Sequence, residues 1–344
     1  MSEPIVNLEG LQREAKNWQN VLRLLPYITM EEVLSKLRIT TLEMTQKEDI
    51  AITFLRKRGV IRPYDGNINH NSEVGKPIES SLKLETAYCS MKDNILNYKD
   101  KKVLSNAGEK IDNQTKKHPL EKLILESAVK TWSEDVIDGL FPAKRDTSDQ
   151  SPLGAFNGYD TIMDNLVTAG EISEVKKNLV SSGEIAEPTS ESDVTALTRI
   201  IDWFKALNPS MRRGELIWYA PDGVVLNVLA ALENKLKYTK DPDVNELAAY
   251  IQKKTLISRL TIITDPCLGS GDRFFVTRPG NLEFGMNSKG DNTFLQVRNP
   301  WEDPNLVQYY MQADFGTRIL IWDQKEFCMN EGTPASLLLS GDYS

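Results

Sequence analysis

Histidine and cysteine are the side chains whose spacing most directly reveals metal sites and nucleophilic catalysis. The chain contains His70, His118, Cys89, Cys267 and Cys328 and no others of either type. Neither histidine has a neighbour at metal-ligand spacing, and no two cysteines form a CxxC pair. We therefore expect no metal site, no catalytic dyad and no disulfide, with thiols that stay reduced in a cytosolic setting.

One glycine-rich stretch has the composition of a phosphate-binding loop. Residues 269–272 (Gly-Ser-Gly-Asp) follow a strand-like segment at 260–264, but they lack the third glycine of a dinucleotide-binding loop. The next residues have the pattern of a strand, whereas a dinucleotide loop opens a helix. The stretch therefore predicts a turn, and we expect neither cofactor-binding nor catalytic residues.

Acidic residues outnumber basic ones, 49 to 41, so the formal net charge is −8. This balance argues against general affinity for nucleic acid, which rests mainly on Lys and Arg beside phosphates. It leaves one alternative open, a soluble α/β enzyme of the hydrolase or transferase kind with an active site of acidic residues. The sequence alone does not single out a pair of carboxylates for that role.

The composition is that of a folded protein. At 344 residues, 40% of them hydrophobic and 26% charged, the chain is long enough for one large or two ordinary domains. No apolar run approaches the roughly 20 residues that span a bilayer, and the N-terminus lacks a secretory signal pattern. We expect neither a membrane span nor a cleaved leader.

The clearest elements lie in the middle and C-terminal parts of the chain. Residues 119–140 carry apolar side chains at helical spacing, which predicts a long helix with one buried stripe. A fully apolar run at 216–219 predicts a buried strand, and a helical pattern follows it after Pro221. Short strands are predicted at 260–264, 274–277, 282–285 and 294–297, and a long one at 306–322.

The N-terminal part has a different pattern. Residues 1–60 read as short helices, one of them opened by a capping box at Thr45-Gln46-Lys47-Glu48. A loop is predicted at 65–77, followed by two alternating segments, 82–90 and 95–104, that would pair as a ribbon through a turn at 91–94. Such a ribbon is marginal alone, so it needs another surface to lie on.

The order of these elements, a helix, a buried strand, a helix, a meander and one long strand, resembles the major capsid protein of tailed bacteriophages. This is the Hong Kong phage type of capsid fold, which encapsulin shells share. The resemblance implies an α+β chain with an N-terminal helical arm (1–75), an extended loop (76–117), a peripheral domain with its spine helix (118–189 and 306–344) and an axial domain (190–305).

The same resemblance implies a structural protein without enzymatic activity, which assembles with itself into hexamers and pentamers of an icosahedral shell. It implies a virion component, made in the bacterial host cytoplasm, that encloses phage DNA without sequence-specific binding. Separate scaffolding, portal and decoration proteins would be its partners.

An assembly interface is expected on the predicted ribbon, because its apolar side chains have too little of their own chain to pack against. A basic cluster before the ribbon is interpreted as an intersubunit ion-pairing site. The residues of this expected interface are Leu82, Leu84, Tyr88, Ile95, Leu96, Arg56, Lys57 and Arg58.

Overall fold

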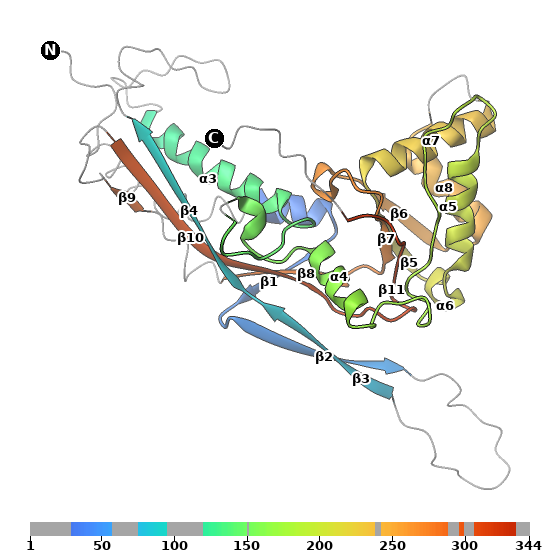
Figure 1. The fold of residues 1–344 in the computed structure, drawn as a ribbon, viewed down its shortest axis with the longest axis horizontal. Helices are drawn as coiled ribbons and strands as arrows, with labels where there is room; N and C mark the ends of the chain where they lie inside the picture. Colours follow the sequence, from blue (N-terminus) through green and yellow to red (C-terminus); the bar gives the residue numbers. More distant parts are fainter. Residues whose placement is uncertain are drawn as a thin grey trace, which may run out of the picture.

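The computed structural model describes residues 29–56, 75–94, 120–149, 151–237, 242–287, 296–298 and 306–334. These residues form two mixed units, each built on its own sheet, together with a two-stranded hairpin that projects away from both (Figure 1). The combination of helices with two mixed sheets confirms the predicted α+β class.

The first sheet has five strands in the order β1–β8–β10–β4, with β9 also paired to β10. The strands are β1 (Thr40–Met44), β4 (Glu85–Asn94), β8 (Leu282–Asn287), β9 (Gln296–Arg298) and β10 (Leu306–Ile319). β1 runs parallel to β8, while the pairings of β10 with β8 and with β4 are antiparallel. The long strand predicted at 306–322 is confirmed as β10, which pairs with β4, β8 and β9.

A long helix, α3 (Leu120–Asp138), lies over the β4–β10 ribbon, and α4 (Tyr159–Thr168) follows it (Figure 1). The predicted helix at 119–140 is confirmed. Val129 and Trp132 are buried in the core between this helix and the sheet, where Trp132 meets Phe315 of β10 edge to face at 5.8 Å. The apolar stripe faces the sheet because burial of such side chains is the main source of helix stability in proteins.

The second sheet has four strands in the order β11–β7–β5–β6. They are β5 (Glu215–Tyr219), β6 (Arg259–Ile263), β7 (Phe275–Thr277) and β11 (Phe327–Met329), and they lie beside α5 (Thr195–Ala206), α6 (Pro209–Arg212), α7 (Asp222–Leu236) and α8 (Val244–Thr255). Leu216 and Trp218 pack in the helical core, whereas Ile217 and Tyr219 pack in the core shared with the first sheet. Both faces of β5 are covered, which is why its sequence is continuously apolar.

The predicted ribbon of 82–90 with 95–104 is wrong in its pairing. The hairpin is formed instead by β2 (Glu48–Arg56) and β3 (Gly75–Lys83), and β4 turns away to pair with β10. The chain changes partner at Leu84, which lies between β3 and β4. Residues 91–94, predicted as a turn, continue β4 along β10. Residues 95–117 lie outside the described part of the chain.

The predicted short helices of the N-terminal region are correct at one place and wrong at another. Residues 29–36 are helical and bury Leu34, but the segment after Thr45 is the strand β2 and no helix. Large apolar side chains recur at every second position, Ile50, Ile52 and Phe54, which is the period of a strand, and this pattern outweighs the capping-box match. Helix α8 was not predicted, although Asp243 caps its first turn by accepting from the Glu246 amide at 2.6 Å.

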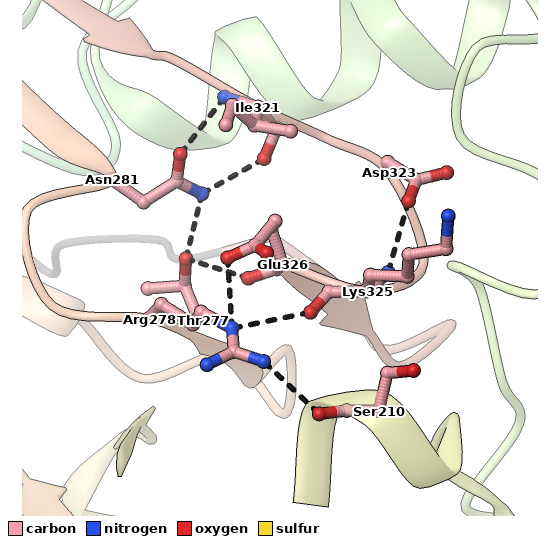
Figure 2. Close-up of polar contacts among 8 residues, drawn as sticks. All are labelled: Ser210, Thr277, Arg278, Asn281, Ile321, Asp323, Lys325 and Glu326. Carbon is pink, nitrogen blue, oxygen red and sulfur yellow. Dashed lines mark hydrogen bonds and ion pairs between the residues drawn. The ribbon is translucent and has the colours of Figure 1, made fainter. Parts of the chain in front are cut away.

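Besides the long helical connection from β4 to β5, the chain has two short crossings between the sheets, which lie next to each other, after β7 and after β10. Asn281 ties the crossings together: its amide donates to Thr277 Oγ1 at 2.7 Å and to the Ile321 carbonyl at 2.8 Å (Figure 2). Its Oδ1 accepts from the Ile321 amide at 2.8 Å. Arg278 adds an ion pair to Glu326 at 2.8 Å and a hydrogen bond to the Ser210 carbonyl at 3.0 Å (Figure 2).

The two sheets do not follow the predicted boundary at 305 in sequence order, and the domain division itself stays a prediction. β8 (Leu282–Asn287) belongs to the five-stranded sheet, although it was assigned to the axial domain. β11 (Phe327–Met329) belongs to the four-stranded sheet, although it was assigned to the peripheral domain. The reason is that a strand joins the sheet whose edge it can pair with, and sequence order does not specify that edge.

Candidate assembly surface

The β2–β3 hairpin leaves the body of the subunit on the side of the first sheet opposite to α3 and α4 (Figure 1). Its outward face carries Ile50 and Ile52, whose side chains are 59% and 57% exposed. Asp49, one residue before Ile50, reaches the sheet, and because successive side chains of a strand alternate in direction, both isoleucines point away from it. The neighbouring cross-strand residues on this face are polar, Ser81 and Glu79.

The root of the hairpin, residues 82–84, lies against a pair of glycines in the first sheet. They are Gly285 of β8 and Gly316 of β10, which lie opposite each other on neighbouring strands. A Cβ atom at Gly285 would lie 2.7 Å from Cδ2 of Leu82 and 3.0 Å from Sδ of Met44. A Cβ atom at Gly316 would collide with the carbonyl oxygen of Lys83. The absence of side chains at this glycine pair is therefore what lets the hairpin root contact the sheet.

Two residues further along the same strands, an Arg318–Glu283 pair faces the hairpin root. Arg318 Nε donates to Glu283 Oε2 at 2.7 Å, and its Nη1 lies 3.0 Å from Asp49 Oδ2. Nη1 also donates to the carbonyls of Asp49 at 3.2 Å and Ser80 at 3.4 Å. One guanidinium thus joins β8, β10 and both strands of the hairpin, a geometry that its planar fork of donors allows.

The residues of the expected interface differ in burial and in the elements that carry them. Leu82 and Leu84 are buried in a small core of their own chain with Met44, so the premise that they lack partners is wrong for these two. Tyr88 lies on β4 with 62% of its surface exposed, and its ring stacks on Tyr310 at 6.3 Å. Of the basic cluster, Arg56 ends β2, and the structure describes only its backbone.

Four residues of the expected interface, Lys57, Arg58, Ile95 and Leu96, lie outside the described part of the chain, as do His70 and His118. The surface residues that the sequence analysis missed are Ile50 and Ile52. Their two-residue spacing, which Phe54 continues, was the signal, and it was hidden by the capping-box pattern just before them.

The cysteines are buried or half-buried thiols. Desolvation, together with the nearby Asp135 carboxylate, raises the pKa of Cys89 to about 11, and desolvation raises the pKa of Cys328 to about 12. Burial, followed by the charge of Asp265, also raises the pKa of Cys267. At neutral pH these groups are thiols, and the thiolate is the nucleophilic form.

Cys89 lines an open groove of about 580 Å³ between β4, the C-terminal half of α3 and the loop around Arg145.

Within the described residues, no group of three or more His, Cys, Asp and Glu side chains is placed to hold a metal ion. The predicted turn at 269–272 is confirmed, since it connects a short 3₁₀ helix, Pro266–Leu268, to β7. Among the described residues, no helix has both the length and the apolar character of a membrane span.

No protein-family model matches the chain, and no curated protein sequence matches it. Its fold is similar to a chain of the satellite phage P4 procapsid, in a structure that includes the size determination (Sid) protein. The TM-score is 0.50 at 13% identity, over 89% of this chain and 98% of that one.

Further similar structures are the capsid of Myoviridae phage XM1, with a TM-score of 0.47 at 12% identity over 85% of this chain and 89% of that one, and the virus-like particle from Pyrococcus furiosus, with 0.45 at 11% over 90% and 97%. The procapsid match covers most of both chains. The chain therefore has the major capsid fold of tailed bacteriophages.

Proposed function

We propose that this chain is a shell-forming subunit, which assembles with copies of itself into the icosahedral head that encloses phage DNA. The observation that carries the proposal is the hairpin: a two-stranded element that projects from a capsid fold and presents Ile50 and Ile52 to solvent. Two large exposed apolar side chains next to each other on a projecting hairpin favour a surface that another protein covers. In a shell the cover would be the adjacent subunit.

Tyr88 extends the proposed contact area onto the edge strand β4, where it stacks on Tyr310. Aromatic side chains are enriched at protein interfaces because they bury a large area at a small cost in conformational entropy. Ile95 and Leu96, and the basic cluster of Arg56, Lys57 and Arg58, remain proposed members of the interface.

The finer assignments belong to the same proposal. The subunits would form hexamers and pentamers, with separate scaffolding, portal and decoration proteins as partners. The chain would be made in the cytoplasm of the bacterial host and end in the virion. It would have no catalytic activity of its own, and the raised pKa values of its three thiols are consistent with that role.

The test is the assembly state of the purified chain, measured by light scattering after size-exclusion chromatography and by negative-stain electron microscopy. We expect capsomers or closed shells whose yield rises steeply with protein concentration, because each shell needs many copies. A compact monomer or dimer at every concentration, with the scaffolding candidates of the same genome present, would contradict the proposal.

Two double variants test how much the hairpin contributes to assembly. Ile50→Ser with Ile52→Ser removes apolar surface from the hairpin, and Leu226→Ser with Val175→Ser removes it from positions that are 62% and 92% exposed elsewhere. The loss of about 1.4 kcal/mol of contact energy between subunits raises the protein concentration needed for assembly about tenfold. We expect this rise for the hairpin variant only, with both proteins folded; an equal rise in both would remove the special role of the hairpin.

A further inference from the structure

The hairpin is attached to the sheet by two contacts of different chemistry. The first is apolar: Leu82 and Leu84 pack at the glycine pair and are almost completely buried. The second is polar: Arg318 forms an ion pair with Asp49 of β2 and also donates to the carbonyls of Asp49 and Ser80. The apolar contact fixes where the root lies, and the polar contact fixes how the hairpin is rotated about that root.

The partners of Arg318 differ in burial. The side chains of Arg318 and Glu283 are 4% and 11% exposed, whereas that of Asp49 is 51% exposed. Removing one member of a buried ion pair leaves an uncompensated charge and destabilises the whole fold. A half-exposed carboxylate stays solvated on its own, so the contact between Asp49 and Arg318 can open while the pair inside the sheet stays intact.

We propose that Arg318 is the positioning residue of the hairpin, and that its link to Asp49 sets the direction in which Ile50 and Ile52 are presented. The importance of this direction for assembly rests on the function proposed above, but the positioning itself is a property of the single chain. Removing the Asp49 carboxylate leaves only the hydrogen bonds from Arg318 to the carbonyls of Asp49 and Ser80, at 3.2 and 3.4 Å, and widens the range of orientations that the hairpin samples about its apolar root.

The experiment measures an intrachain distance by double electron–electron resonance. Spin labels are attached at Glu79→Cys on β3 and Lys130→Cys on α3, two exposed positions, in a Cys89→Ser background. The labelled chain is diluted into an excess of unlabelled chain, so that the distance is read within one subunit whether or not it has assembled. Asp49→Ala is compared with Glu32→Ala, which removes a carboxylate from the exposed pair with Lys36.

We expect one narrow distance distribution in the parent chain and in the Glu32→Ala control, and loss of that single narrow peak in Asp49→Ala. Both variants should keep the melting temperature of the parent. Arg318→Lys should also broaden the distribution, because one ammonium group cannot replace a fork that serves three strands. If Arg318→Lys fails to fold, the comparison of Asp49→Ala with its control still decides.

An unchanged narrow peak in Asp49→Ala would overturn the inference, even if the parent chain forms shells. A narrow peak in the parent chain that is lost in Asp49→Ala, in a protein that never assembles, would leave the positioning role in place and count against the shell function alone. The two proposals therefore fail on different measurements.

Discussion

Gly285 and Gly316 are the residues at which the hairpin comes closest to the sheet, because neither position has room for a Cβ atom. The obstacles differ in kind. At Gly285 they are the ends of the Leu82 and Leu84 side chains, which can change rotamer, whereas at Gly316 it is the backbone carbonyl of Lys83. Side chains adapt to an added methyl group more cheaply than backbone does.

We expect Gly316→Ala to lower the free energy of unfolding by about 2–3 kcal/mol and Gly285→Ala by about 1 kcal/mol, since overpacking a close contact costs about 1–3 kcal/mol. Chemical denaturation measures both. The matched control is Gly223→Ala in the first turn of α7, where an added Cβ atom meets nothing. Alanine is the better helix former, so this variant should be neutral or more stable by up to about 1 kcal/mol.

The reverse order, with Gly285→Ala costing more than Gly316→Ala, would show that the hairpin root adapts through its backbone. Neither glycine could be recognised from the sequence, because each lies inside a strand and its role depends on a segment about 200–230 positions earlier in the chain. The same holds for Arg318, whose partners Asp49 and Glu283 come together only when the sheet has formed.

Among the elements, the two crossings between the sheets depend most on a single side chain. Asn281 is 5% exposed and makes three hydrogen bonds to groups of both crossings. Asn281→Ala leaves the Ile321 amide and carbonyl without these partners, and we expect a loss of about 3 kcal/mol, because each buried group left unpaired costs about 1–3 kcal/mol. Thermal unfolding measures it, and the exposed Asn245→Ala is the control.

Calorimetry adds a second readout of the same variant. Since the crossings couple two sheets with a shared core, the parent chain should unfold in one transition. Two separated transitions in Asn281→Ala would show that the joint makes the units cooperative, while an unchanged single transition at the parent temperature would contradict the role given to Asn281.

The apolar stripe of helix α3 gives a second prediction at the scale of a single element. Val129 is 1% exposed, so Val129→Asp would bury a carboxylate without a partner and should destabilise the subunit by several kcal/mol. Ser127→Asp places the same carboxylate on the exposed face of the helix and should change the stability by less than about 0.5 kcal/mol. Equal melting temperatures for the two variants would show that the stripe is not core.

The elements that the sequence predicted well are those with one unambiguous period. The apolar run at 216–219, the helix at 119–140 and the long strand at 306–322 are all present, because their patterns match only one kind of burial. The hairpin was misplaced because strand pairing is a long-range choice: β4 alternates equally well whether its partner is the next segment or β10.

At the scale of the whole molecule, the net charge of −8 bears on the contents of a shell. We expect the chain to bind free duplex DNA with a dissociation constant weaker than about 100 µM at 0.15 M salt, since non-specific affinity depends on phosphate neutralisation by basic residues. Fluorescence anisotropy with a labelled duplex measures it over a series of salt concentrations. A dissociation constant near 1 µM that changes little with salt would contradict this expectation.

The sheet order has a consequence for the timing of synthesis. β1 pairs with β8, and β4 pairs with β10, so strands near the start of the chain wait for partners that the ribosome makes more than 200 residues later. The four-stranded unit has most of its strands close together in sequence and is expected to fold first, since local contacts form faster than distant ones. The hairpin root rests on β8 and β10, so it acquires its full contact surface only after β10 has been synthesised. In the proposed shell, the contact surface of a growing chain would therefore be correctly placed only after its last long strand had emerged from the ribosome.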